Sequence, residues 1–285
     1  MSERARRRDP HLAVKREVLV RYLDAWTPVA LRSQRGATYV ESGAAEFVVD
    51  AFRVFGESAD RMDDGHHLDM VLVGPAVELG ERPEGLTVRT LTDPADLKVT
   101  GPVLAHLDAV AEADAWRLVD QLGKGKGREV LLSLPAVEQA DEYRDHLHSK
   151  GLTCTVAVEL VDDDGHAELL LFATGDSKHL AIFKNELWAA DEFAGIRYRD
   201  PHDTEHALVD ISLTPQLLPL RRVLLAELTR RGPTTVADLQ QHTLMETIYR
   251  PADAVNALTS AAAKGAITKE PEKGRLTPKT IVSAA

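Results

Sequence analysis

The first part of the chain carries apolar residues at helical spacing along one face. These residues are Leu12, Leu19, Tyr22, Leu23 and Trp26. The spacing predicts an amphipathic helix over residues 11–27, which ends or kinks at Pro28.

Short apolar runs then alternate with amphipathic segments. The runs predict strands at 37–40, 68–73, 86–91, 102–107 and 129–134, and the segments predict helices at 47–55, 112–122 and 137–148. Strands that alternate with helices at this spacing predict right-handed βαβ units and an open parallel sheet.

The pattern changes after residue 151. Two strand-like runs, 152–161 and 167–174, flank an Asp-Gly turn at 164–165, which is a hairpin signal. The parallel sheet is therefore expected to end in an antiparallel pair. A helix is predicted at 179–190, and the polar residues 191–215 are expected to form a linker.

The last seventy residues have a different layout. Helices are predicted at 217–231, 236–245 and 251–264, and strands at 266–269 and 280–282 flank a polar loop. Three helices followed by a strand, a basic loop and a strand are the layout of a winged helix. The predicted organisation is an N-terminal helix packing on the core (1–28), an α/β Rossmann-like domain (29–200) and a winged-helix domain (216–285).

Composition narrows the class of protein. With 285 residues, 44% of them hydrophobic, the chain is long enough for about two packed domains. Its single cysteine, Cys154, excludes a disulfide framework and a cysteine-based zinc site, and no metal site is assigned. No apolar run approaches the length of a membrane span, so a cytoplasmic protein without membrane contact is expected.

Charge is unevenly distributed along the chain. The net charge is −11, yet residues 216–285 hold ten lysines and arginines against six acids, a net charge of +4. A basic terminal unit on an acidic body is a first indication of a nucleic-acid partner.

Candidate chemistry lies in the loop after the first strand, residues 41–46. Open α/β sheets bind ligands at the carboxyl ends of their strands, so Glu41 and Gly43 are candidate ligand contacts. A single glycine here is also compatible with an ordinary strand–helix turn, which is the favoured interpretation. The Gly123–Gly127 run does not open a helix, so we interpret it as a solvated turn.

Several segments resemble the three-Cys-motif partner (TcmP) family. The similar segments are His11–Lys15 with Tyr22–Trp26, Leu169–Thr174 with Phe183–Trp188, and Leu220–Leu225 with Tyr249–Arg250 and Ala266–Ile267. The resemblance covers most of the chain. It implies a class I methyltransferase-like fold with S-adenosylmethionine at the first strand.

The resemblance also locates a cofactor site. The run from Tyr39 to Phe47 corresponds to the family's first-strand motif and keeps the acid as Glu41, with Gly43 beside it, but most of the motif's glycines are replaced. Asp93 after the third strand suits an adenine contact, and Asp108 matches the family's acid after the fourth. Because the second strand ends without an acid, a degenerate site without a cofactor is expected, with S-adenosylmethionine binding as the alternative.

Three functions remain open, and no catalytic residue is assigned. The favoured hypothesis is a non-catalytic or regulatory, nucleic-acid-associated protein in DNA or RNA processing or repair, beside a three-Cys-motif partner. Its candidate contacts with DNA or RNA are Arg250, Lys269, Lys273, Arg275 and Lys279. The alternatives are an active methyltransferase with an unusual cofactor loop, and an assembly subunit without nucleic-acid contact.

Overall fold

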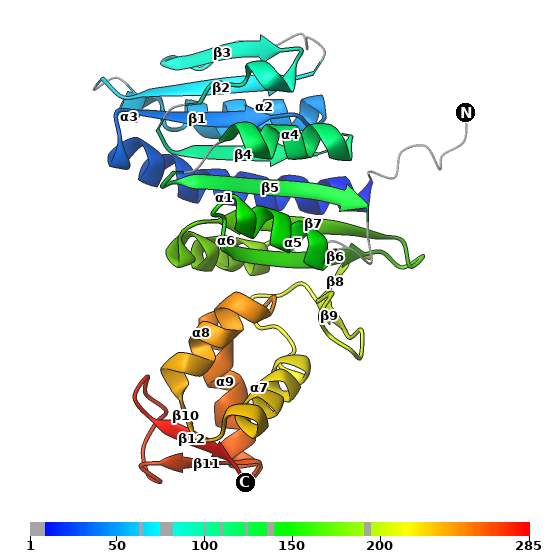
Figure 1. Ribbon diagram of the computed structural model, residues 1–285, viewed down its shortest axis with the longest axis vertical. Coiled ribbons are helices and arrows are strands. Elements are labelled where there is room, and N and C mark those ends of the chain that lie inside the picture. Colours follow the sequence, from blue (N-terminus) through cyan, green and yellow to red (C-terminus); the bar gives the residue numbers. More distant parts are fainter. Residues whose placement is uncertain are drawn as a thin grey trace.

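The computed structural model describes residues 9–62, 65–74, 82–99, 101–108, 111–122, 125–135, 140–190 and 195–285. Within these ranges a large nine-stranded sheet is followed by a unit of three helices and a small sheet (Figure 1). None of the helices in this part of the chain combines the length and the apolar character that crossing a bilayer requires.

Five parallel strands form the first part of the large sheet. They are β1 (Gly36–Glu41), β2 (His67–Val73), β3 (Leu86–Leu91), β4 (Val103–Leu107) and β5 (Arg128–Pro135). Their spatial order is β3-β2-β1-β4-β5, so the direction of progress along the sheet reverses between β1 and β4. This is a Rossmann-like arrangement, as the alternating pattern predicted.

The other end of the sheet is antiparallel. The hairpin of β6 (Cys154–Val161) and β7 (Ala167–Thr174) places β7 between β5 and β6, as expected from the Asp-Gly turn. Two further strands, β8 (Arg197–Arg199) and β9 (Leu208–Asp210), extend the sheet beyond β6. The prediction of a linker over 191–215 was therefore wrong, and the sheet domain continues past residue 200. Three-residue strands are too short to show a clear alternation of apolar and polar residues.

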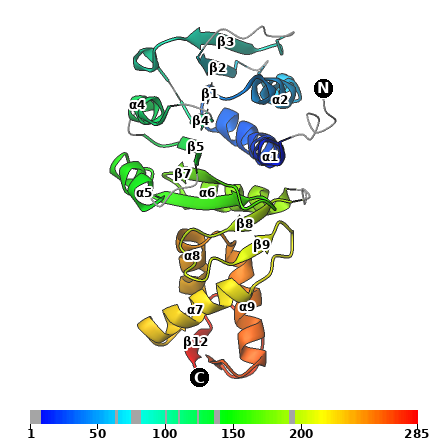
Figure 2. The same cartoon turned by 90° about the vertical axis from the view of Figure 1, so that its right-hand side faces the viewer.

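Helices cover both faces of the sheet (Figure 2). One face packs against α1 (Pro10–Ser33), α2 (Ala45–Gly56) and α6 (Ser177–Ala189), and the other against α4 (Glu112–Leu122) and α5 (Ala140–Ser149). Two short helices, α3 (Ala59–Met62) and the 3₁₀ helix η2 (Pro94–Asp96), lie in connections. Residues 136–139, where the sequence predicts the start of α5, lie outside the described ranges.

Helix α1 continues past the proline that was expected to end or kink it. Pro28 removes one backbone donor, but the helix runs on to Ser33. Ala30 and Leu31 are buried on the same face as the residues before the proline, and Thr27 Oγ1 donates to the Leu23 carbonyl at 2.8 Å. Burial of this extra turn against the sheet offsets the missing hydrogen bond.

The C-terminal unit holds the elements predicted for it. Its helices are α7 (Leu218–Arg231), α8 (Val236–Glu246) and α9 (Pro251–Ala263), and its strands are β10 (Thr234–Thr235), β11 (Ile267–Glu270) and β12 (Ile281–Ala284). The strands pair antiparallel in the order β10-β12-β11. Thr235 begins α8 by accepting a hydrogen bond from the Asp238 amide at 3.1 Å.

A buried lysine joins the two units. Lys184 of α6 is fully buried, and its Nζ donates to the carbonyls of Thr243 (3.2 Å), Leu244 (2.6 Å), Thr247 and Tyr249 (3.1 Å) at the end of α8. Burial lowers the pKa of Lys184 to about 7. The carbonyl end of a helix favours a positive charge, so this contact fixes α8 on the sheet domain.

Candidate cofactor site and candidate nucleic-acid surface

The candidate cofactor site lies where β1 and β4 end side by side. Glu41 of β1 is in register with His106 of β4, and Asp108 follows β4. The strand order reverses between these two strands, and doubly wound sheets bind their ligands outside the carboxyl ends at such a reversal. Two of the predicted site residues, Glu41 and Asp108, therefore lie at this edge.

The carboxylate of Glu41 is committed to internal partners. It is buried and accepts hydrogen bonds from the Tyr39 hydroxyl, from the Gly43 amide at 2.6 Å and from His106 Nδ1 at 2.9 and 3.0 Å. Burial, and then the Glu41 charge, raise the pKa of Tyr39 well above its usual value, which keeps this hydroxyl protonated as a donor. Glu41 thus fixes the loop that follows β1.

His106 is a site residue that the sequence analysis missed. Its side chain is fully buried, and its ring lies edge-on to Phe47 with centroids 4.6 Å apart. Among the described residues, nothing forms a hydrogen bond with its Nε2. An unsatisfied buried polar atom is costly, which makes this nitrogen a candidate ligand contact. The two-residue period of a strand places His106 on the same face as Asp108, so the sequence pattern could have identified it as a neighbour of the candidate site.

Two glycines, Gly43 and Gly74, follow neighbouring strands at this edge. A Cβ on Gly43 would lie 2.7 Å from Phe47 Cδ2 and 2.8 Å from Glu41 Oε1, so a larger residue cannot fit without movement. Gly74, directly after β2, has φ of 131° and open space where a Cβ would lie. Gly43 is therefore required by the packing of Phe47 and Glu41, whereas Gly74 leaves open space that fits the close approach of an adenosyl group at this edge.

Asp108 forms a buried ion pair at the same edge. Lys15 of α1 lies 2.9 Å from Asp108 Oδ1 and 2.9 Å from Glu168 Oε2 on β7. Burial lowers the pKa of Lys15, but the charges and hydrogen bonds of Asp108 and Glu168 outweigh that effect and leave it raised. The pair holds Asp108 in place between α1 and the end of β4.

Asp93 lies apart from this cluster, after β3. It is exposed, and its side chain accepts a hydrogen bond from the Ala95 amide at 2.8 Å, which begins η2. Its predicted contact with adenine stays a prediction.

Within the described ranges, no three histidine, cysteine or acidic side chains are grouped as metal ligands.

The predicted nucleic-acid contacts fall into two groups. Lys273, Arg275 and Lys279 are exposed in the β11–β12 loop and form no ion pair within the described part of the chain, while the Lys269 amine donates to the Gly274 carbonyl. Arg250 lies at the opposite end of α9.

The Arg250 guanidinium is engaged within the protein. Its Nε and Nη2 donate to the Asp253 carboxylate, both at 2.9 Å, and Nη2 also donates to the Leu213 carbonyl at 2.8 Å. The side chain is only 14% exposed. Arg250 therefore stabilises the start of α9, and the loop lysines and Arg275 are the cations available to a phosphate.

No protein-family model matches the chain, and no curated protein matches it. The 16S rRNA (adenine(1408)-N(1))-methyltransferase from Catenulisporales acidiphilia is similar over 53% of this chain and 90% of its own, with 16% identity and a TM-score of 0.30. Magnesium protoporphyrin IX methyltransferase from Synechocystis PCC 6803 with bound SAM is similar over 56% and 83%, with 13% identity and a TM-score of 0.29. Superpositions this loose carry no conclusion about the activity of this chain.

Proposed function

We propose that the sheet domain binds S-adenosylmethionine and acts as a methyltransferase. The observation that carries this proposal is the strand order β3-β2-β1-β4-β5-β7-β6, with its reversal at β1 and β4. A doubly wound sheet binds its ligand at such a reversal, outside the carboxyl ends of the strands. When bound, the cofactor supplies an electrophilic methyl group. This proposal favours the active alternative over a degenerate site without a cofactor.

The predicted cofactor contacts have different roles in this proposal: Glu41 and Gly43 shape the loop after β1, and Asp93 and Asp108 border the cofactor. The open space at Gly74 admits the cofactor, and His106 Nε2 offers it a polar atom that has no partner among the described residues. Asp93 is exposed at the end of β3 and is free to accept from an adenine amine with its second oxygen. Asp108, held by Lys15, bounds the space on the β4 side.

Calorimetric titration of the purified chain with S-adenosylmethionine and S-adenosylhomocysteine tests the proposal. We expect micromolar binding, weakened about tenfold or more by Gly43→Ala, because the added methyl forces the loop away from Phe47. Gly125→Ala is the matched control, because its Cβ meets only Arg128 at 3.7 Å, before β5. Absence of binding by the native chain, or equal affinity of both variants, contradicts the proposal.

A second candidate function is a nucleic-acid-associated protein whose C-terminal unit is a winged helix. Lys273, Arg275 and Lys279 of the β11–β12 loop favour it, because they are exposed and form no ion pair with another described residue, and phosphate contacts need available cations. The exposed side chains of α9 are small and uncharged, such as Asn256 and Thr259, so contact without sequence preference is expected.

Fluorescence anisotropy with duplex DNA and duplex RNA at several salt concentrations tests this candidate. Replacing Lys273, Arg275 and Lys279 by serine should weaken binding and reduce the slope of log affinity against log salt by about 2.7. The control replaces three exposed lysines of the sheet domain, Lys98, Lys126 and Lys178. An unchanged slope in the loop variant eliminates this surface as the site of phosphate contact. Cofactor binding without methyl transfer to either nucleic acid favours the non-catalytic form of this candidate.

A further inference from the structure

A cavity of about 140 Å³ lies where the C-terminal unit meets the outer edge of the sheet, at the opposite end of the strand order from β3. Its apolar walls come from β9, α7 and the segment after α8, through Val209, Pro219, Val223 and Ile248. A cavity of about 150 Å³ with apolar walls accepts benzene, so this one has room for a single ring.

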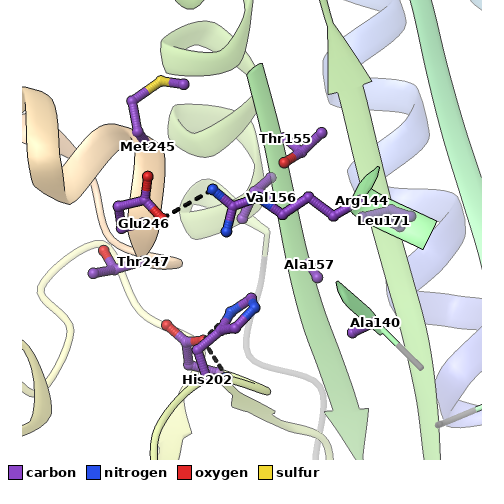
Figure 3. A pocket seen from close by; sticks show the side chains of 11 residues that line it. Ala140, Arg144, Thr155, Val156, Ala157, Leu171, His202, Met245, Glu246 and Thr247 are labelled. Carbon is purple, nitrogen blue, oxygen red and sulfur yellow. Dashed lines mark hydrogen bonds and ion pairs between the residues drawn. The ribbon is translucent and has the colours of Figure 1, made fainter. Parts of the chain in front are cut away.

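A second, much smaller hollow of about 10 Å³ lies next to the cavity and has room for about one water molecule (Figure 3). Asp200, His202, Glu246 and Thr247 line both spaces. On the side of the smaller hollow, Arg144 donates to Glu246 Oε2 at 2.9 Å, and the His202 ring lies between the carboxylates of Asp141 and Asp200. The Arg144–Glu246 pair joins α5 to the C-terminal unit, and the His202–Asp141 pair joins α5 to the segment between β8 and β9.

Two side chains that line the larger cavity can each accept a further hydrogen bond. Within the described residues, Glu246 Oε1 takes part in no hydrogen bond, and the His242 ring has no closer polar contact than Glu227 Oε1 at 3.7 Å. Burial lowers the pKa of His242 against the opposing effects of Glu227 and Glu246, so its ring is neutral at pH 7 and presents a lone pair. By contrast, Asp200 accepts from the Ile248 amide at 3.2 Å and Asp203 from the Ala207 amide at 3.0 Å.

We propose that this cavity is a binding site for a small primary ammonium compound that carries one hydrophobic ring. The ring packs against Val209, Val223 and Ile248, and the ammonium donates to Glu246 Oε1 and to the neutral imidazole of His242. Asp203 is paired with Arg222 at 3.5 Å, so Glu246 Oε1 supplies the negative charge that disfavours a ligand carboxylate there. The site requires neither S-adenosylmethionine nor nucleic acid, so its test is independent of both proposed functions.

Three probes with the same ring separate shape from charge. Calorimetric titration of the full chain with benzylamine, benzyl alcohol and benzoate should give affinities in that order, with steps of about tenfold. Val223→Trp fills the cavity and should abolish binding of benzylamine. The control is Ala226→Trp, which adds the same ring to the exposed side of α7.

A charge variant completes the test. Glu246→Gln should lower the affinity for benzylamine to that for benzyl alcohol and leave the alcohol unaffected. Equal affinities for the three probes overturn the proposal, and so does undiminished benzylamine binding by a folded Val223→Trp chain. If Val223→Trp does not fold, the Glu246→Gln titration decides, because unchanged discrimination between amine and alcohol equally overturns the proposal.

Discussion

Two buried glutamates lie under the same helical layer, at opposite ends of the parallel strands. Glu41 ends β1 at the carboxyl edge, and Glu129 lies near the start of β5 at the amino edge. Each carboxylate accepts a hydrogen bond from a buried tyrosine and a contact from a histidine Nδ1. The partners are Tyr39 and His106 for Glu41, and Tyr22 and His179 for Glu129.

The two clusters differ in what remains unsatisfied. The His179 side chain is 23% exposed at the start of α6, so its second nitrogen is open to water. The His106 side chain is 0% exposed, and its Nε2 has no partner among the described residues. The carboxyl-edge cluster therefore keeps one buried nitrogen without a partner among the described residues, which the proposed cofactor site would use. The two clusters share their residue types, and only their position along the strands and their unmet hydrogen bonds distinguish the proposed cofactor site from the other cluster.

The largest expected effect comes from removing the structural carboxylate. Glu129→Ala leaves the Tyr22 hydroxyl and the His179 ring without their acceptor in a buried setting, and should lower the free energy of unfolding by about 3–5 kcal/mol. Chemical denaturation measures the change. Glu129→Gln keeps one oxygen as acceptor and should lose less. A decrease in the free energy of unfolding below about 1 kcal/mol for Glu129→Ala contradicts this prediction, because it means that water replaces the carboxylate as acceptor.

The next effect tests the functional half of the comparison. Glu41→Gln rearranges the hydrogen bonds to the Gly43 amide and to His106, and should weaken S-adenosylmethionine binding about tenfold in calorimetric titration. Glu129→Gln is the matched control and should leave this affinity unchanged. Equal losses in the two variants mean that both clusters act only through general stability.

The smallest effect is a dependence of stability on pH at the amino edge. The hydrogen bond to Glu129 raises the pKa of His179 above its ordinary value of 6.5, against the effect of burial. Because the folded-state pKa is the higher one, this stabilisation is fully present below pH 6.5 and is lost as the pH rises through the raised value. The stability difference between the native chain and His179→Gln should therefore shrink between pH 6 and pH 9, by on the order of 1 kcal/mol. A difference that stays constant with pH contradicts the assignment of a charged His179.

Much of the fold follows from the sequence pattern. The strands at 86–91 and 167–174 and the helix at 112–122 have the predicted bounds, because their apolar periods are uninterrupted. The segments that differ depend on tertiary packing. Helix α1 crosses Pro28 because its next turn is buried, and β8 and β9 form because β6 offers an open edge.

The candidate site was predictable only in part. Glu41 and Asp108 follow from their places at strand ends, but their partners His106 and Lys15 lie 65 and 93 residues away in sequence. Such pairs depend on the packing of α1 and on the register of β1 with β4. The buried position of Lys184 could have been predicted, because this charged residue lies next to Phe183 among the apolar residues of the predicted helix at 179–190.

The Lys184 contact couples the thermal unfolding of the two units. Separating the two units would leave four main-chain oxygens without their shared donor and would strip Trp188 of its bond to the Ile248 carbonyl. Partial detachment would therefore break five hydrogen bonds between the two units at once. Differential scanning calorimetry should show one cooperative peak, and a protease should find no intermediate in which one half stays native while the other is digested.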